Sequence, residues 1–154
     1  MRDFIESNYL IFISSDGRRE GYEIFKERIN NNLWPIYKKT PQLINIEKDK
    51  KILFYIAGTN TLCQNFVAST SIKEIIDLKS ISSDPNQEFR QVLFNVRFNE
   101  INYFQKPVNI KNHINNLSFI EEEKRKYYGL YLQGGVCKIN EQTYEYIINK
   151  SSEV

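Results

Sequence analysis

The chain is poor in the residues that build metal and redox sites, with one histidine and two cysteines among 154 residues. Cys63 and Cys137 are far apart and lie in no metal-ligand spacing, so a zinc site is not expected. Two free buried thiols fit better than a disulfide, which indicates a reducing compartment. The first residues lack the apolar core of a signal peptide, and no apolar run approaches the ~20 residues that cross a bilayer. We therefore expect a cytoplasmic protein with no membrane partner.

The motifs of common enzymes are also missing. There is no glycine-rich phosphate loop, no Gly-x-Ser-x-Gly elbow and no His-Glu-x-x-His helix. Only His113 could act as a base for Cys63, and a lone histidine in the short helix expected over 109–116 fits a surface or helix-end position better. Glu122 and Glu123 stand in a charge run typical of an exposed helix face. We therefore expect neither catalysis nor a cofactor.

Aromatic residues, by contrast, are abundant, with ten tyrosines and ten phenylalanines. Rings suit a pleated, half-buried surface, so the core is expected to be built from β-strands. The hydrophobic and charged shares, 41% and 26%, are near those of globular proteins, and the length fits one domain over 1–154. A net charge of +2 permits an anionic partner without requiring one.

Strand and helix patterns alternate along the chain. Apolar residues at 92, 94, 96 and 98 alternate with polar residues at 91, 95, 97 and 99, the period of a strand with one buried face. A helical period runs from 18 to 30, with Ser15 or Asp16 as its expected cap, and a second helix is expected after Asn140. The strands predicted in this way span 9–13, 52–58, 66–72, 92–98 and 136–139.

Two connections carry aromatic rings. Trp34, the only tryptophan, precedes Pro35, which pushes it towards extended geometry, and Tyr37, Lys38 and Lys39 follow. A ring on a connection beside cations can stack a planar ligand, although a core tryptophan that anchors the loop is the alternative. The second connection is Tyr127 to Gly135. If the two meet, they form a cup with aromatic walls and backbone amides that could hold a splayed-out base.

The order of these elements resembles a known family. The series begins with a strand, a helix and the Asn/Leu-Trp-Pro loop. It continues with the 49–55 run, the 91–98 strand and the segments 104–108 and 132–139. This series, from Tyr9 to Lys150, resembles the EVE domain of the PUA-like superfamily, a relative of the YTH domain. The resemblance implies an α+β fold, a small, strongly curved mixed β-barrel flanked by helices, with a pocket that reads a modified base.

The resemblance also implies where the pocket lies. Its walls map to the tryptophan loop, to the end of the 52–58 strand and to the turn before the 136–139 strand. Family members often carry arginine in that turn, where this chain has Gln133, and a cage of several indoles cannot form from one tryptophan. Tyrosines at 37, 55 or 131 would supply the second ring. The implied ligand-binding residues are Trp34, Pro35, Ile36, Tyr37, Lys38, Tyr55, Ala57, Gly58, Asn60, Tyr131, Leu132, Gln133 and Gly134.

The favoured hypothesis is a non-enzymatic module that binds DNA or RNA by inserting a flipped, modified base between Trp34 and a tyrosine. Gln133 or Asn60 would bond the base edge. Phosphates would be positioned by Lys38, Lys39, Arg125 and Lys126. A reader of this kind implies an effector protein as a possible partner. Two alternatives remain open, an RNA-processing enzyme of the ASCH type and a domain that binds a small molecule or nucleoside.

Overall fold

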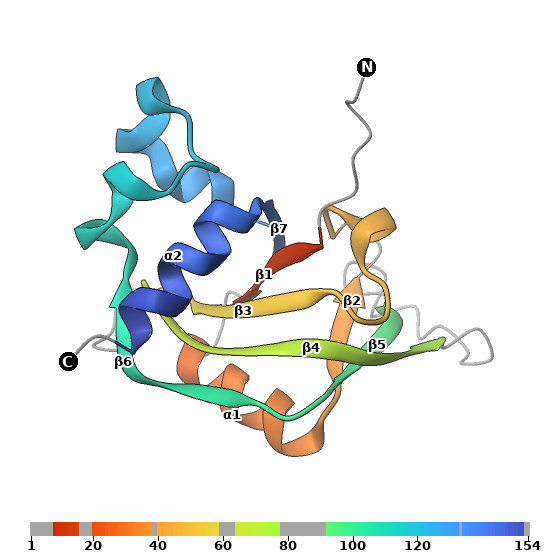
Figure 1. Cartoon of the computed structure of the whole chain (residues 1–154). Coiled ribbons are helices and arrows are strands. Elements are labelled where there is room, and N and C mark those ends of the chain that lie inside the picture. The colour runs from red at the N-terminus through yellow and green to blue at the C-terminus, as the bar shows by residue number, and fades with distance from the viewer. Residues whose placement is uncertain are drawn as a thin grey trace.

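The computed structural model describes residues 8–15, 20–37, 40–58, 64–77, 92–132 and 134–152. Seven strands form one mixed sheet in the order β2-β5-β4-β3-β1-β7, with β6 paired to β4 (Figure 1). The β1–β3 pair is parallel and the other pairs are antiparallel. The strands are β1 Tyr9–Ser14, β2 Trp34–Tyr37, β3 Lys51–Ile56, β4 Asn65–Asp77, β5 Val92–Phe98, β6 Asn102–Asn109 and β7 Val136–Ile139.

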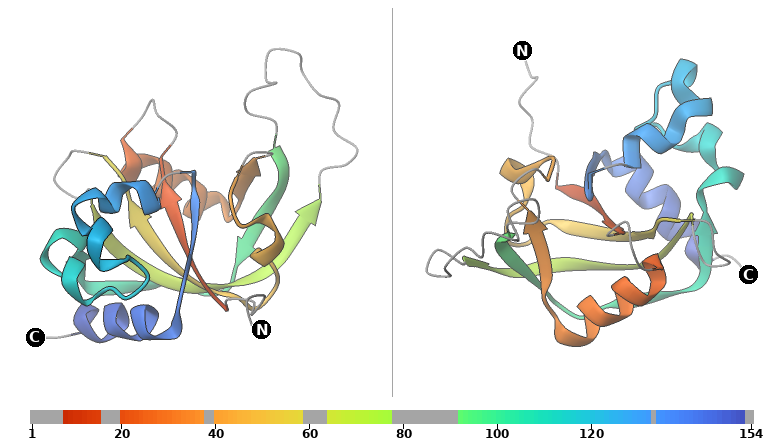
Figure 2. Two further views of the ribbon diagram at one scale, coloured as in Figure 1. Left: turned by 90° about the horizontal axis from the view of Figure 1, so that it is seen from above. Right: turned by 180° about the vertical axis from the view of Figure 1, so that it is seen from behind.

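The sheet is strongly curved but does not close. The long strand β4 pairs with β3 and β6 over its first half and with β5 over its second half. Its register shifts against all three neighbours, and such bulges bend and twist a strand. The sheet therefore curls on itself (Figure 2), while β2 and β7 stay unpaired with each other in the described chain. The expected curved mixed sheet of an α+β fold is confirmed.

β1 and β3 are buried on both faces because a separate hydrophobic core packs on each face. Alternate residues of β1 belong to two separate cores: Leu10 and Phe12 to one, Ile11 and Ile13 to the other. The first core includes Trp34 and four phenylalanines, and we call it the aromatic core. The second lies under the C-terminal half of the chain. The continuous apolar runs at 9–13 and 52–58 thus predicted these strands correctly.

Two α-helices accompany the sheet. α1 spans Gly21–Asn31 and α2 spans Glu141–Ser151, where the Asn140 side chain accepts a hydrogen bond from the Thr143 amide at 2.9 Å. The predicted cap of α1 was wrong: the helix begins after Glu20, which makes no side-chain cap. Asp16, one of the two expected caps, lies outside the described residues. None of the described helices is long and apolar enough to cross a membrane.

The C-terminal half contains several 3₁₀ turns where longer helices or connections were predicted. These are η3 Ile110–Asn112, η4 Ile114–Asn116 and η5 Glu122–Leu132. The predicted helix over 109–116 is therefore two short turns with His113 between them. The His113 Nδ1 atom lies 2.7 Å from the Tyr146 hydroxyl of α2, which anchors these turns to the helix.

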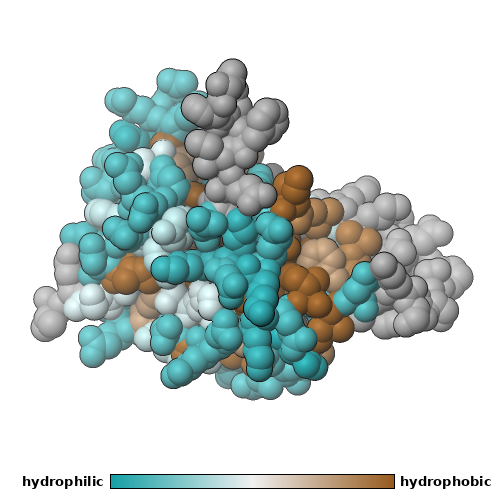
Figure 3. Space-filling model, turned by 45° about the vertical axis from the view of Figure 1, so that its right-hand side comes forward, coloured by the Kyte–Doolittle hydropathy of each residue, from teal (hydrophilic) through white to brown (hydrophobic). Residues whose placement is uncertain are grey.

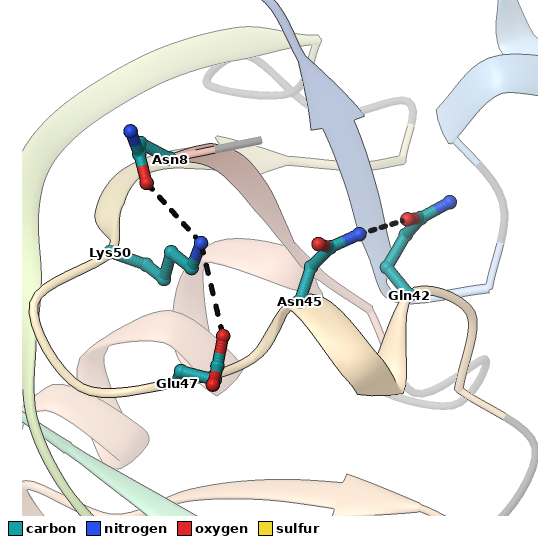
Figure 4. Close-up of polar contacts among 5 residues, drawn as sticks. All are labelled: Asn8, Gln42, Asn45, Glu47 and Lys50. Atoms are coloured by element: carbon teal, nitrogen blue, oxygen red, sulfur yellow. Dashed lines mark hydrogen bonds and ion pairs between the residues drawn. The ribbon is translucent and has the colours of Figure 1, made fainter. Parts of the chain in front are cut away.

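A polar cluster ties the connection between β2 and β3 to the start of β1 (Figure 4). Lys50 is only 5% exposed, and its Nζ atom donates to Asn8 Oδ1 at 3.3 Å and lies 3.9 Å from Glu47 Oε1. Beside it, Asn45 Nδ2 donates to Gln42 Oε1 at 2.8 Å in the turn η1 Leu43–Asn45. The predicted solvated charge cluster at 47–51 is thus partly buried, because Lys50 points inward.

The surface brought forward in Figure 3 is largely hydrophilic, with hydrophobic side chains gathered on one side. This is the side of β2 and β5 in Figure 1, and the first four residues of β5 are only half-buried. Of the alternating apolar residues of β5, only Val96 and Phe98 are buried. These two residues face the aromatic core.

Cys137 is a free, buried cysteine in β7, and burial raises the pKa of its thiol to about 12. The thiolate is the reactive form, so we expect no reaction with a disulfide reagent near pH 8. The measurement uses a Cys63→Ser variant, in which one thiol should react only after denaturant is added. The raised pKa also means that stability falls as pH rises from the ordinary thiol pKa towards about 12, because the unfolded chain loses the proton first. Rapid labelling of Cys137 in the folded Cys63→Ser variant near pH 8 would contradict the expected lack of reaction.

Candidate functional site

The carboxyl ends of β1 and β3 lie side by side. The parallel register pairs Ser14 with Ile56, and the Ala57 amide donates to the Ser14 carbonyl at 3.3 Å. Backbone groups beyond the carboxyl ends of parallel strands are where ligands commonly bind in open sheets. We call this region the carboxyl edge. Its described residues are Ser14, Gly21, Tyr37, Pro41, Ala57, Gly58, Gly134 and Gly135.

The first residue of α1 packs directly on this edge. A Cβ atom at Gly21 would lie 2.5 Å from the Ala57 carbonyl oxygen and 2.7 Å from the Ser14 carbonyl oxygen. The Ser14 hydroxyl, fully buried, donates to the Gly21 carbonyl. Only glycine therefore lets the N-terminus of α1 come so close to both strands.

The two ring-bearing segments meet here as well. The Ile13 amide donates to the Gly135 carbonyl at 2.8 Å, which places the turn before β7 beside the end of β1. At Gly134, φ is 87° and a Cβ atom would lie 2.7 Å from the Pro41 ring. Pro41 follows a turn in which the Tyr37 amide donates to Thr40 Oγ1 and the Thr40 amide donates to the Tyr37 carbonyl. The structure thus brings the segment after β2 against the turn before β7.

Trp34 does not present its ring to this site. It lies in β2, 2% exposed, with Phe54 at 5.1 Å from its ring centroid and the Arg28 guanidinium at 4.9 Å. The expectation of an accessible indole on a connection is therefore wrong, and the alternative of a core tryptophan is right. The physical reason is that extended geometry before a proline suits an edge strand as well as a loop. Ile36 is buried in the same core, whereas Pro35 is half-buried.

Tyr55 and Tyr131 are occupied by packing. Tyr55 is 3% exposed and lies in the second core, on the face of β3 opposite to Phe54 and Trp34, with Phe66 at 5.1 Å. Tyr55 and Trp34 therefore cannot form one cup. The Tyr131 ring packs edge-on against Phe119 at 5.9 Å, and its hydroxyl accepts from the Glu121 amide at 3.3 Å. Leu132 is 7% exposed.

Tyr37 is the predicted ring that packing leaves available. It is half-buried, and its side chain has no ring partner or hydrogen bond within the part of the chain that the structure describes. A register shift between Ile36 and Tyr37 redirects the strand at this point. Tyr37 belongs to the carboxyl edge together with Ala57, Gly58 and Gly134. Lys38, Asn60 and Gln133 lie outside the described residues.

Three residues of this region were not predicted from the sequence. Gly21 and Pro41 make the close backbone contacts described above, and no local pattern marks them. Tyr128 donates its hydroxyl to Gln64 Oε1 at 2.8 Å, which joins η5 to the residue just before β4. The aromatic run at 127–131 was a signal for this contact, although it did not show which tyrosine points inward.

No protein-family model and no curated protein sequence matches the chain. Solved structures do match. The N-terminal domain of Staphylothermus marinus McrB aligns with a TM-score of 0.60 at 16% identity, covering 95% of this chain and 96% of that one. Protein Atu2648 from Agrobacterium tumefaciens gives 0.59 at 15%, covering 94% and 92%. Human THYN1, solved in complex with 5-methylcytosine-containing DNA, gives 0.55 at 12%, covering 95% and 98%.

At these identities the matches show the fold. The chain has a mixed α+β architecture with a curved, unclosed seven-stranded sheet, in agreement with the PUA-like and EVE folds of these proteins.

Proposed function

We propose that the chain is a nucleic-acid-binding module that holds a flipped, modified base at the carboxyl edge. The observation that carries the proposal is the convergence of five segments there: the ends of β1 and β3, the start of α1, the segment after β2 and the turn before β7. The fold match to human THYN1, whose structure contains 5-methylcytosine DNA, supports a base as the ligand. Glycines allow the backbone to approach such a ligand closely.

The groups of the carboxyl edge suit a flat heterocycle that has hydrogen-bonding atoms around its ring. In this proposal the Tyr37 ring stacks on the base, and main-chain groups of Ala57, Gly58 and Gly134 bond its edge. Trp34 belongs to the packed wall behind the site and does not stack. Lys38, Asn60 and Gln133 remain candidates from the sequence for phosphate and edge contacts. We also propose a cytoplasmic setting and a separate effector protein that responds to binding.

We propose a reader without catalysis. The carboxyl-edge residues named above supply hydroxyl, phenol and main-chain groups, and none of these eight is a carboxylate or histidine that could act as a general base near neutral pH. The RNA-processing alternative predicts cleavage of labelled RNA, with or without a divalent metal. Reproducible cleavage that a Tyr37 substitution removes would favour that alternative.

The test is a binding titration with a panel of oligonucleotides. The panel holds duplex DNA with one 5-methylcytosine or one N6-methyladenine, single-stranded RNA with one N6-methyladenine, and the unmodified counterpart of each. We expect one modified member to bind more tightly than its counterpart. Tyr37→Ala should weaken that binding by about fivefold or more, since stacking contributes roughly 1–3 kcal/mol per base.

Tyr37→Phe is the matched control, because it keeps the ring and removes only the hydroxyl. It should bind within about twofold of wild type if stacking is the contribution of this residue. Equal affinity for all panel members, unchanged by Tyr37→Ala, would rule out the proposed function.

A further inference from the structure

The segment η5 forms a wall beside the carboxyl edge. Its Tyr128 hydroxyl donates to Gln64 Oε1, and the Gln64 amide in turn donates to the Ile56 carbonyl at 2.6 Å, at the end of β3. η5 ends at Leu132, two residues before Gly134, which contacts Pro41. Both the middle and the end of η5 are therefore fixed next to the proposed base site.

From Tyr127 onwards, the tyrosine and leucine side chains of η5 divide into an inward row and an exposed, outward row. Residues three apart lie over one another in such a helix. Tyr128 and Tyr131 point inward and are held by the contacts described above. Tyr127 and Leu130 form the outward row and are 55% and 65% exposed. At Tyr127 the backbone leaves helical geometry (φ −113°, ψ 31°), so the exposed ring sits at a kink.

A cation accompanies the exposed ring. The Lys126 Nζ atom lies 5.2 Å from the centroid of the Tyr127 ring, and within the described part of the chain it makes no ion pair. Lys124, by contrast, is 3.5 Å from the Glu121 carboxylate. Lys126 therefore places a positive charge, with no ion pair among the described residues, beside an exposed aromatic surface. This pairing of ring and cation suits a nucleic-acid strand, in which bases and phosphates alternate.

We infer that Tyr127, Leu130 and Lys126, here called the η5 platform, bind the nucleotide that adjoins the flipped base. The Tyr127 ring stacks on the neighbouring base, Leu130 extends the apolar surface and Lys126 contacts the phosphate. The inference rests on the proposed function, because it needs a strand at the carboxyl edge. A nucleic-acid strand is the occupant because the platform adjoins that edge and combines an exposed ring with a neighbouring lysine cation.

Tyr127→Ala tests the platform against the oligonucleotide panel described above, with free 5-methyldeoxycytidine and N6-methyldeoxyadenosine as single-base probes. We expect binding of the preferred oligonucleotide to weaken by about tenfold, while binding of the free nucleosides is unchanged, since these cannot reach the platform. Tyr103→Ala is the matched control. Tyr103 is 63% exposed on β6, and its ring lies 6.4 Å from that of Phe25 on the α1 side of the sheet. This control should bind like wild type.

The charge contribution is measured separately by salt dependence. Lys126→Ala should reduce the slope of log affinity against log salt by about 0.7–0.9, the loss of one phosphate contact. Lys124→Ala, which removes a lysine already paired with Glu121, should change the slope less.

The outcomes separate the two proposals. Wild-type chain that binds no oligonucleotide of the panel overturns both. Selective wild-type binding that Tyr127→Ala leaves unchanged overturns the platform alone. If that variant instead abolishes a dimer seen by analytical ultracentrifugation and binds as wild type, the platform contacts a second copy of the chain, and the inference is wrong.

Discussion

Replacing Trp34 by alanine should lower the free energy of unfolding by about 3–5 kcal/mol, the cost of deleting a large buried ring. The indole is enclosed by Phe12, Phe54 and Phe98, with ring centroids at 5.8, 5.1 and 6.0 Å, and by the Arg28 guanidinium. Domains of this size are stable by roughly 5–15 kcal/mol, so this variant should be close to unfolding at physiological temperature. Urea denaturation followed by circular dichroism measures the change, since the substitution removes the only tryptophan.

This expectation changes how a binding assay on Trp34 variants is interpreted. Loss of nucleic-acid binding in Trp34→Ala would follow from unfolding and would say nothing about stacking. Trp34→Phe keeps a ring in the core and should fold, with binding within about twofold of wild type. If Trp34→Phe is folded but does not bind, the indole takes part in the site and its assignment to the core is wrong. Weak acrylamide quenching of wild-type fluorescence would agree with the 2% exposure of Trp34.

The sequence was informative where one local pattern has one structural meaning. The apolar runs of β1 and β3 indicated central strands, because only a strand covered on both faces needs no polar alternation. Asn140 indicated the start of α2, and it does accept the capping hydrogen bond from Thr143. β6 was missed as a separate strand because its polar residues and Pro107 suggest an ending, whereas an edge strand tolerates both.

The candidate site was harder to predict because its contacts join distant parts of the chain. Pro41 and Gly134 meet only because the sheet curls, and no local pattern encodes that contact. Since neighbouring strand residues point to opposite faces, Phe54 and Tyr55 could not both face Trp34. The Trp34–Pro35 step fixed extended geometry but could not distinguish a loop from an edge strand.

Gly21→Ala should destabilise the fold by about 1–3 kcal/mol, although alanine is normally the better helix residue. The gain in helix propensity, about 0.5–1 kcal/mol, is smaller than the cost of the overlap. The new Cβ atom would lie 2.5 Å and 2.7 Å from the Ala57 and Ser14 carbonyl oxygens. Both are main-chain atoms, one in the last residue of β1 and one directly after β3, so neither can move as a flexible side chain does. For a chain of this length the melting temperature should fall by about 2–12 °C.

The same substitution also tests the carboxyl edge as the binding site. Relief of the overlap must push the start of α1 away from Ser14 and Ala57, which alters the backbone groups that hold the base in our proposal. Gly21→Ala should therefore weaken binding of the preferred oligonucleotide even at temperatures where the variant is fully folded. Gly129→Ala is the matched control, because a Cβ atom there meets nothing within 4 Å. A folded Gly21→Ala variant that binds as tightly as Gly129→Ala would place the base site away from the junction of β1, β3 and α1.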